Sequence, residues 1–292
     1  MTYRFSHCPC CGEERFRGKI NPNYCAPLNS GDFFWGGWRY IKDIISCEKC
    51  GYGFINSLIP RYEQFYKEFG DSDEGYSSGS VDRARFYRSL QMQIKKKSSF
   101  DLNSFDTVLD VGAGDGEFLK SLNSTMLKSA IEPSPALNAM LGKSGVEVFF
   151  DVGEIPDSRK FQVISVNDVL EHVEDPSLFV NQLLSILEEN GVMIISVPDY
   201  SRILARMLKH KYYLTTPMHL SYFTWKSMRS LLSNRTDIKL LSITKAPTVY
   251  ARLSDALKWL KVDSDNLASR LMSKIPIGYR ANFIAIIQKN CV

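Results

Sequence analysis

The sequence predicts an α/β protein whose main domain is a doubly wound, Rossmann-like parallel sheet, preceded by a small cysteine-rich domain. From about residue 105, short apolar runs alternate with amphipathic stretches, which is typical of parallel strands joined by helices. Two C-x-x-C-G units lie nearer the N-terminus. A glycine-rich turn follows the first apolar run, at a position where such sheets bind ligands.

The composition fits a globular protein and excludes overall disorder, because 44% of the 292 residues are hydrophobic and 12% are aromatic. No apolar run reaches the roughly 18 residues of a membrane span, and no signal-peptide core is visible, so we expect a cytoplasmic protein. The net charge of +4 hides an asymmetry. Residues 100–199 carry 5 basic and 17 acidic side chains, whereas residues 200–292 carry 16 and 4. This split indicates two faces, one of which can meet an anion.

Three parts are predicted along the chain. The first is irregular and rich in glycine, proline and aromatic residues, and the second is a connector with helical periodicity. The third holds the alternating strands and helices. The predicted boundaries are 1–59 for the cysteine-rich domain, 60–99 for the connector and 100–292 for the sheet domain, with helical inserts near 200–223 and 246–280.

Within the sheet domain, strands are predicted where apolar and β-branched residues run together, and helices where helical spacing follows a capping residue. Asp175 before Pro176 provides an N-cap and a proline at the first helical position, and Thr224 caps a later helix. The predicted strands cover residues 107–111, 129–132, 146–150, 161–166, 192–197, 238–243 and 282–287. The predicted helices cover residues 117–126, 134–141, 176–189 and 224–234.

The glycine-rich turn places glycines at alternate positions, 112, 114 and 116, which lets the backbone approach a ligand closely. A dinucleotide fingerprint needs its last glycine at position 117, where this chain has Glu117. With Asp115 beside it, this acid disfavours pyrophosphate and favours a cation. Glu132, at the end of the next strand, stands where a carboxylate accepts the ribose hydroxyls. The predicted ligand is a cationic nucleoside without phosphates, such as S-adenosylmethionine, and a tight turn without a ligand is the alternative.

These residues resemble a known family. Residues 108–116 resemble motif I of class I S-adenosylmethionine-dependent methyltransferases, and residues 131–135 resemble their second acidic motif. Residues 168–176 are similar to the segment after the fourth strand in the subgroup related to ubiquinone-biosynthesis O-methyltransferases. The segments 217–220 and 223–227 are similar to the later histidine segment of that subgroup. The resemblance covers about 105–290 and implies a seven-stranded methyltransferase sheet.

The resemblance also implies cofactor contacts. The glycine-rich turn would line the methionine part, Glu132 would hold the ribose, and Asp151 with Val152 would flank the adenine. Asn167 and Asp168 would lie beside the cofactor, and a connector tyrosine would close over it. The implied cofactor-binding residues are Tyr76, Asp110, Gly112, Ala113, Gly114, Gly116, Glu132, Pro133, Asp151, Val152, Asn167 and Asp168.

Two histidines are candidates for the chemistry. Because the sulfonium already activates the methyl group, the protein must mainly align a nucleophile and remove a proton. His172 follows the fourth predicted strand, and His219 precedes a later helix, so either is a candidate general base, with a structural role as its alternative. Some similar proteins bind a divalent cation in this segment through Glu and His. Here Asn167 and Asp168 precede Glu171, which departs from Glu-x-x-Glu-His, so metal-assisted deprotonation is not favoured.

The two C-x-x-C-G units contain Cys8, Cys11, Cys47 and Cys50. Each unit can present two thiolates from one tight turn, and the glycine after it permits a positive φ. Four thiolates match a closed structural zinc site, so the first domain is predicted to be a zinc ribbon. A redox C-x-x-C is the alternative, which is disfavoured because neither pair opens a βα unit.

Three functions remain open from the sequence. They are an O-methyltransferase of a small molecule or carbohydrate, an RNA methyltransferase, and a non-catalytic cofactor-binding module. Basic residues after the fifth strand favour an anionic acceptor, such as a phosphorylated or nucleotide-linked sugar. Nucleic acid is disfavoured because residues 1–59 carry 7 basic against 5 acidic side chains. A ribbon before such a domain is similar to a bacterial group that includes deoxysugar C-methyltransferases, so C-methylation is an alternative.

Overall fold

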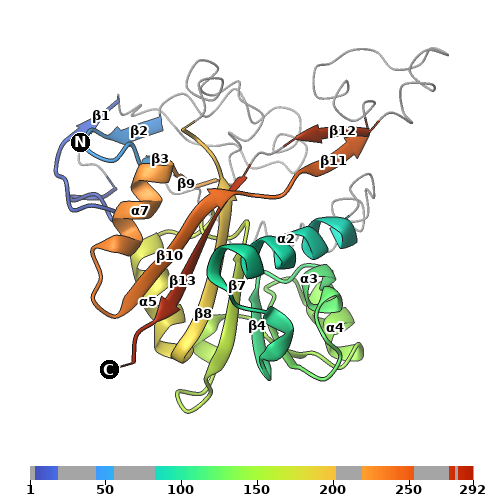
Figure 1. Ribbon diagram of the computed structural model, residues 1–292. Helices are drawn as coiled ribbons and strands as arrows, with labels where there is room; N and C mark the ends of the chain where they lie inside the picture. The colour runs from blue at the N-terminus through green and yellow to red at the C-terminus, as the bar shows by residue number, and fades with distance from the viewer. Residues whose placement is uncertain are drawn as a thin grey trace.

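The computed structural model describes residues 4–18, 44–55, 83–201, 219–252, 276–279 and 282–291. A seven-stranded sheet forms its centre (Figure 1). In spatial order the strands are β10 (Ile238–Lys245), β13 (Asn282–Lys289), β8 (Leu187–Pro198), β7 (Phe161–Asn167), β4 (Thr107–Val111), β5 (Leu127–Ile131) and β6 (Glu147–Phe149).

Five strands of this sheet, from β8 to β6, are parallel, whereas β13 is antiparallel to both β8 and β10. The chain passes from β4 to β5 and β6 in one direction and then returns to β7 on the other side of β4. The strand order therefore reverses between β4 and β7, which is the point where doubly wound sheets bind ligands. All seven strands coincide with predicted ones, and the predicted fold class is confirmed.

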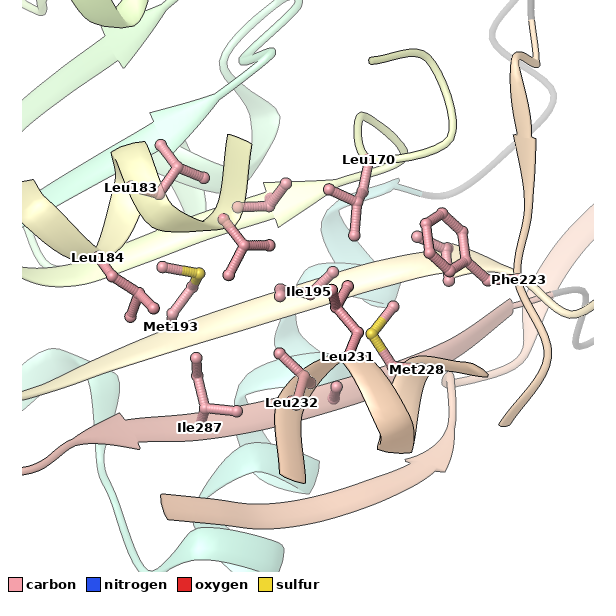
Figure 2. Close-up of a cluster of buried hydrophobic side chains, with 14 of the residues drawn as sticks. Leu170, Leu183, Leu184, Met193, Ile195, Phe223, Met228, Leu231, Leu232 and Ile287 are labelled. Atoms are coloured by element: carbon pink, nitrogen blue, oxygen red, sulfur yellow. The ribbon is translucent and has the colours of Figure 1, made fainter. Parts of the chain in front are cut away.

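Helices cover both faces of the sheet (Figure 1). Helices α2 (Arg83–Ser98), α3 (Glu117–Ser121) and α4 (Pro135–Lys143) share one apolar cluster, which contains Leu90, Phe118 and Leu141. Helices α5 (Pro176–Ile186) and α7 (Trp225–Ser233) share another. Figure 2 shows side chains of α5 and α7 meeting those of β8 and β13. Each fully buried Leu or Ile stabilises the fold by about 1.5–3 kcal/mol.

The predicted helix starts are confirmed. The carboxylate of Asp175 accepts hydrogen bonds from the amides of Ser177 and Leu178 at 2.9 and 3.0 Å, and Pro176 begins α5. Thr224 and Ser227 form a capping box at the start of α7. Each such cap stabilises a helix by about 1 kcal/mol.

Two predicted helix ends are wrong. The helix expected over 117–126 stops at Ser121, because the Asn123 side chain accepts from the Thr125 amide and so forms a polar turn that competes with the helix. The helix expected over 176–189 stops at Ile186, and Leu187 already pairs with Phe161 in the sheet. Asn190, with φ of 61°, also stands in the left-handed region, which a helix cannot include.

The inserts that were expected to be helical contain strands. Within 246–280, β11 (Val249–Arg252) and β12 (Pro276–Tyr279) pair antiparallel, in keeping with their β-branched and aromatic residues. Within 200–223, β9 (Ser221–Tyr222) is a strand, because it pairs with a strand from the N-terminal part. The remainder of both inserts lies outside the described residues, as do the basic residues Arg202, Arg206, Lys209, His210 and Lys211.

The N-terminal part contributes β1 (Phe16–Arg17), β2 (Ile44–Cys47) and β3 (Gly53–Ile55), and β9 completes a four-stranded sheet in the order β1-β2-β3-β9. These strands lie beside α7 in Figure 1. Tyr52 and Phe54 are fully buried, and both belong to the apolar cluster that continues beneath α7 and α5. The N-terminal part therefore packs against the sheet domain through a shared core. Among the described helices, none has the length and apolarity needed to cross a bilayer.

Candidate active site and cysteine centre

The glycine-rich turn lies at the carboxyl end of β4, where the strand order reverses. Gly112, Gly114 and Gly116 have φ of 68°, 55° and 75°, a region that other residues adopt only at a cost. A Cβ at Gly112 would lie 2.5 Å from the Val169 side chain. Gly112 therefore lets the backbone pass close to the segment after β7, and the neighbouring Ala113 is buried.

Replacing Gly112 with alanine is expected to lower the free energy of unfolding by about 2–4 kcal/mol, from the unfavourable φ and the clash with Val169 together. Gly142 in α4 is the matched control, because a Cβ there meets nothing within 4 Å. Gly142→Ala should be neutral or stabilising by up to about 1 kcal/mol. Urea titration of both variants checks this, and equal stability of the two would contradict it.

Glu132 follows β5, and its side chain is 4% exposed. One carboxylate oxygen accepts from the Gly114 amide at 2.8 Å, and the other accepts from the Ser134 amide at 2.9 Å. Burial raises the pKa of this carboxyl, and the two amides oppose the rise. Each oxygen keeps a second lone pair, so the carboxylate can still accept from the paired hydroxyls of a ribose.

Two further acids lie at this end of the sheet. Asp110 is buried in β4, and burial raises the pKa of its carboxyl to about 8, helped by the charge of Glu132 and opposed by the Ser165 hydroxyl. Asp115 in the turn accepts a 2.6 Å hydrogen bond from the Arg83 guanidinium, which ties α2 to the turn. A cationic ligand beside Asp110 would lower the cost of burying its charge.

The other predicted cofactor residues surround the same edge in different ways. Asn167 ends β7 and donates to the Ser165 hydroxyl at 2.6 Å, and its buried side-chain oxygen has no hydrogen-bond partner in the part of the chain that the structure describes. Asp168, with φ of 54°, accepts a hydrogen bond through its carboxylate from the side-chain amide of Asn282. Asp151 caps the turn after β6 through the Gly153 amide at 2.7 Å, and Val152 packs against the core. Pro133 is exposed, and Tyr76 lies outside the described residues.

The structure brings the two candidate catalytic histidines together. The rings of His172 and His219 are 4.8 Å apart between centroids and meet edge to face at 78°. Glu171 lies with them, because side-chain ligand atoms of all three residues fall within 4.8 Å of one another. Glu171 is 1% exposed, and among the described residues neither of its carboxylate oxygens has a hydrogen-bond partner. Burial raises the pKa of Glu171, and the charge of Asp168 raises it further.

From the sequence, Glu171 was predicted only as part of an incomplete metal motif. The feature that points to it as a site residue is its position next to His172, directly after β7. The grouping with His219 depends on contacts between segments about 48 positions apart, which spacing along the chain does not reveal.

The four predicted cysteine ligands also come together. Side-chain sulfur atoms of Cys8 and Cys50 are 3.6 Å apart, as are those of Cys11 and Cys47. A tetrahedral zinc with Zn–S bonds of about 2.3 Å places its sulfurs about 3.8 Å apart. Gly12 and Gly51 have φ of 71° and 74°, as predicted for the residue after each C-x-x-C unit. The set therefore has the geometry of a closed four-thiolate site.

Of the other cysteines, Cys10 is buried beside Cys8, Cys291 is exposed, and Cys25 lies outside the described residues. Donation from the thiols of Cys10 and Cys50 lowers the pKa of Cys8 to about 2, and the hydrogen bond to Cys8, together with burial, raises the pKa of Cys50. Four neighbouring sulfurs therefore resist full ionisation by themselves, and a bound cation would relieve the repulsion.

A seven-stranded sheet of this order, with a glycine-rich turn after β4 and a buried glutamate after β5, defines a class I S-adenosylmethionine-dependent methyltransferase. Residues 82–241 match the family described as "Methyltransferase domain". The match covers more than half of the chain, and the chain belongs to this family. The family resemblance predicted from the sequence is confirmed.

Two curated relatives are ubiquinone biosynthesis O-methyltransferases. The protein of Glaesserella parasuis is 28% identical over 103 residues, covering 30% of this chain and 44% of the relative. The protein of Azorhizobium caulinodans is 32% identical over 101 residues, covering 30% and 39%. The matched part thus spans less than half the length of either relative.

The fold is also similar to that of the plantazolicin methyltransferase BpumL, whose structure was solved in complex with SAH. The TM-score is 0.51 at 14% identity, covering 79% of this chain and 94% of that chain. A complex of the same enzyme with SAH and a triazolic desmethylPZN analogue gives a TM-score of 0.52 at 16% identity, over 79% and 98%. At this level of identity the likeness establishes the fold.

Proposed function

We propose that the protein transfers the methyl group of S-adenosylmethionine to an oxygen atom of a small-molecule or carbohydrate acceptor. The grouping of Glu171, His172 and His219 beside the cofactor edge of the sheet carries this proposal. Glu132 and the glycine-rich turn would hold the cofactor, and the histidines would face the acceptor. The O-methyltransferase activity named for both curated relatives supports oxygen as the nucleophile.

In the proposed step, the acceptor oxygen attacks the methyl carbon, the carbon–sulfur bond breaks, and S-adenosylhomocysteine leaves. The hydroxyl proton passes to the imidazole of His219 or His172, either of which is a suitable base near neutral pH. Because burial raises the pKa of Glu171, its carboxyl would carry a charge only beside a protonated imidazole, and it lies close enough to both histidines for such a pair.

A divalent cation is a poorer fit to this group. Glu171 and the two histidines offer three ligand atoms, but the Asp168 carboxylate, at the position of the first glutamate in the related motif, is engaged by Asn282. The proposed step therefore relies on the side chains alone.

The acceptor is proposed to be anionic, such as a phosphorylated or nucleotide-linked sugar, because residues 200–292 carry 16 basic against 4 acidic side chains. Radiolabelled S-adenosylmethionine, offered with sugar phosphates, nucleotide sugars, catechol carboxylates and total RNA, tests this. Label on an oxygen of a small anionic acceptor is expected. Label on carbon would replace O-methylation with C-methylation, and label on RNA alone would overturn the proposal.

We also propose that the four cysteines hold a structural zinc ion, supported by the sulfur spacing and the left-handed glycines. Such thiolates persist in a reducing compartment, which supports the expected cytoplasmic location. Elemental analysis should find one zinc per chain, and Cys47→Ser should lose it because removing one of the four thiolate ligands weakens zinc binding. Cys291→Ser, which alters an exposed cysteine, should keep the zinc. Absence of zinc from the freshly purified protein, or its retention in Cys47→Ser, would contradict the assignment.

A further inference from the structure

We propose that the second cysteine turn of the zinc site positions the segment that carries His219, so that the acceptor side of the active site depends on the bound zinc. We name residues 47–55 the second knuckle and residues 219–224 the histidine segment. The inference rests on the proposed function for the role of His219 in methyl transfer. It goes further than that function, because it assigns to the N-terminal part the positioning of an active-site residue.

The backbones of the two segments are joined directly. Strand β3 of the second knuckle pairs antiparallel with β9 of the histidine segment, with Gly53 opposite Tyr222 and Phe54 opposite Ser221. The Ile55 amide also donates to the Leu220 carbonyl at 3.2 Å, one residue from His219. A Cβ at Gly53 would lie 3.1 Å from the Tyr222 Cβ, so the strands pack without room for a side chain. The histidine segment is therefore held as an additional strand of the N-terminal sheet.

Buried side chains strengthen this junction. The Tyr52 and Ser221 hydroxyls form a hydrogen bond of 2.6 Å, and the two residues are 0% and 1% exposed. The Thr224 hydroxyl donates to the carbonyl of Cys50, itself a proposed zinc ligand, at 2.9 Å. The second knuckle thus contacts the histidine segment at both ends of β9, and one of these contacts comes from a proposed ligand of the metal. The contacts of Tyr52 and Thr224 are buried, where a lost partner costs most.

On its other side, the histidine segment contacts the catalytic group. The Ser221 amide donates to the Glu171 carbonyl at 3.0 Å, and the His219 ring meets the His172 ring. Ser221 therefore joins the second knuckle to Glu171 through its hydroxyl and its amide. A shift of the knuckle would move His219 relative to the other two residues.

The cofactor side has different supports. Glu132 follows β5 and Gly114 follows β4, and the two residues form a hydrogen bond with each other; the hydrogen bonds of both residues that the structure describes stay within the sheet domain. Loss of zinc should therefore impair the acceptor side and leave cofactor binding intact. A purely stabilising zinc site would have no such selectivity.

The test compares the full-length zinc-loaded protein with the same protein after chelation and with Tyr52→Phe. Tyr52→Phe removes one hydroxyl and keeps the ring that packs against Phe54 and Phe223. Phe16→Leu is the matched control, because it disturbs the same small core from β1, which β2 and β3 separate from β9. Three readouts are taken: the imidazole NMR signals of His219 and His172, the affinity for S-adenosylhomocysteine by calorimetry, and label transfer to the acceptor found above.

Chelation and Tyr52→Phe should both shift the His219 signal, while the affinity for S-adenosylhomocysteine stays within about two-fold. Label transfer should fall by at least about ten-fold after chelation, since small misplacements of a catalytic group cost up to about 10²-fold. Phe16→Leu should leave the His219 signal in place. An unchanged His219 signal in the zinc-free protein and in Tyr52→Phe would overturn the inference. The His219 NMR signal reports the position of the ring without any methyl transfer. Whether His219 acts in methyl transfer is tested separately, by the activity of His219→Asn.

Discussion

Replacing His219 with asparagine is expected to slow methyl transfer by about 10²- to 10⁴-fold, the usual contribution of a general acid or base. Affinity for S-adenosylmethionine should be unchanged, because the glycine-rich turn and Glu132, which are proposed to hold the cofactor, lie after β4 and β5, whereas His219 meets His172 after β7. Asparagine keeps a polar side chain of moderate size, so the lower rate of methyl transfer would reflect the missing base. Single-turnover transfer of labelled methyl groups measures the chemical step directly.

The comparison with two other histidines makes this result specific. His172→Asn tests the second candidate, and the larger loss of the two identifies the base. His7→Asn is the control, because His7 lies on the N-terminal part, where it contacts Ser6 and Glu14 at the surface. Full single-turnover rates in both His219→Asn and His172→Asn would exclude histidine as the base.

Replacing Glu132 with glutamine is expected to weaken S-adenosylmethionine binding by about 10²-fold, which corresponds to roughly 2–3 kcal/mol. Both carboxylate oxygens accept from backbone amides, at Gly114 and at Ser134. Glutamine supplies one acceptor oxygen, so its NH₂ group must face one of these amide donors, and a buried donor is left without a partner. The ribose hydroxyls would also lose one acceptor. Calorimetric titration with S-adenosylhomocysteine gives the affinity.

Glu189→Gln is the control for this change. Glu189 is exposed, near the start of β8 at the opposite end of the sheet, and forms an ion pair with Lys289. Its replacement should leave the affinity unaltered. An affinity in Glu132→Gln within about three-fold of the parent protein would contradict the role assigned to Glu132.

The sheet was predictable because apolar and β-branched residues run together in its strands, and the central strands β7 and β8 are buried along most of their length. The glycine-rich turn and Glu132 were equally readable, since a positive φ and a buried ribose acceptor demand particular residue types. The four cysteines were readable for the same reason, because their spacing and following glycines reflect a local turn. Features that depend on a few consecutive residues could therefore be predicted from the sequence.

The features that escaped prediction depend on contacts between distant segments. Nothing local in Ser221 and Tyr222 indicates a strand, since their extended state comes from pairing with Gly53 and Phe54. The end of α5 at Ile186 is likewise set by the pairing of Leu187 in the sheet. The predicted domain boundaries place the second knuckle and the histidine segment in different domains, so their contact was not predicted. The proposed dependence of the active site on zinc rests on this contact.

A crystal structure of the zinc-loaded protein with S-adenosylhomocysteine tests the central claim most directly. We predict that the ribose hydroxyls lie within hydrogen-bond distance of the Glu132 carboxylate. The sulfur atom of S-adenosylhomocysteine should face the group formed by Glu171, His172 and His219. We also predict zinc bound by the four cysteines, with β9 paired to β3. A ribose placed away from Glu132, or a sulfur atom directed away from the histidines, would contradict this claim.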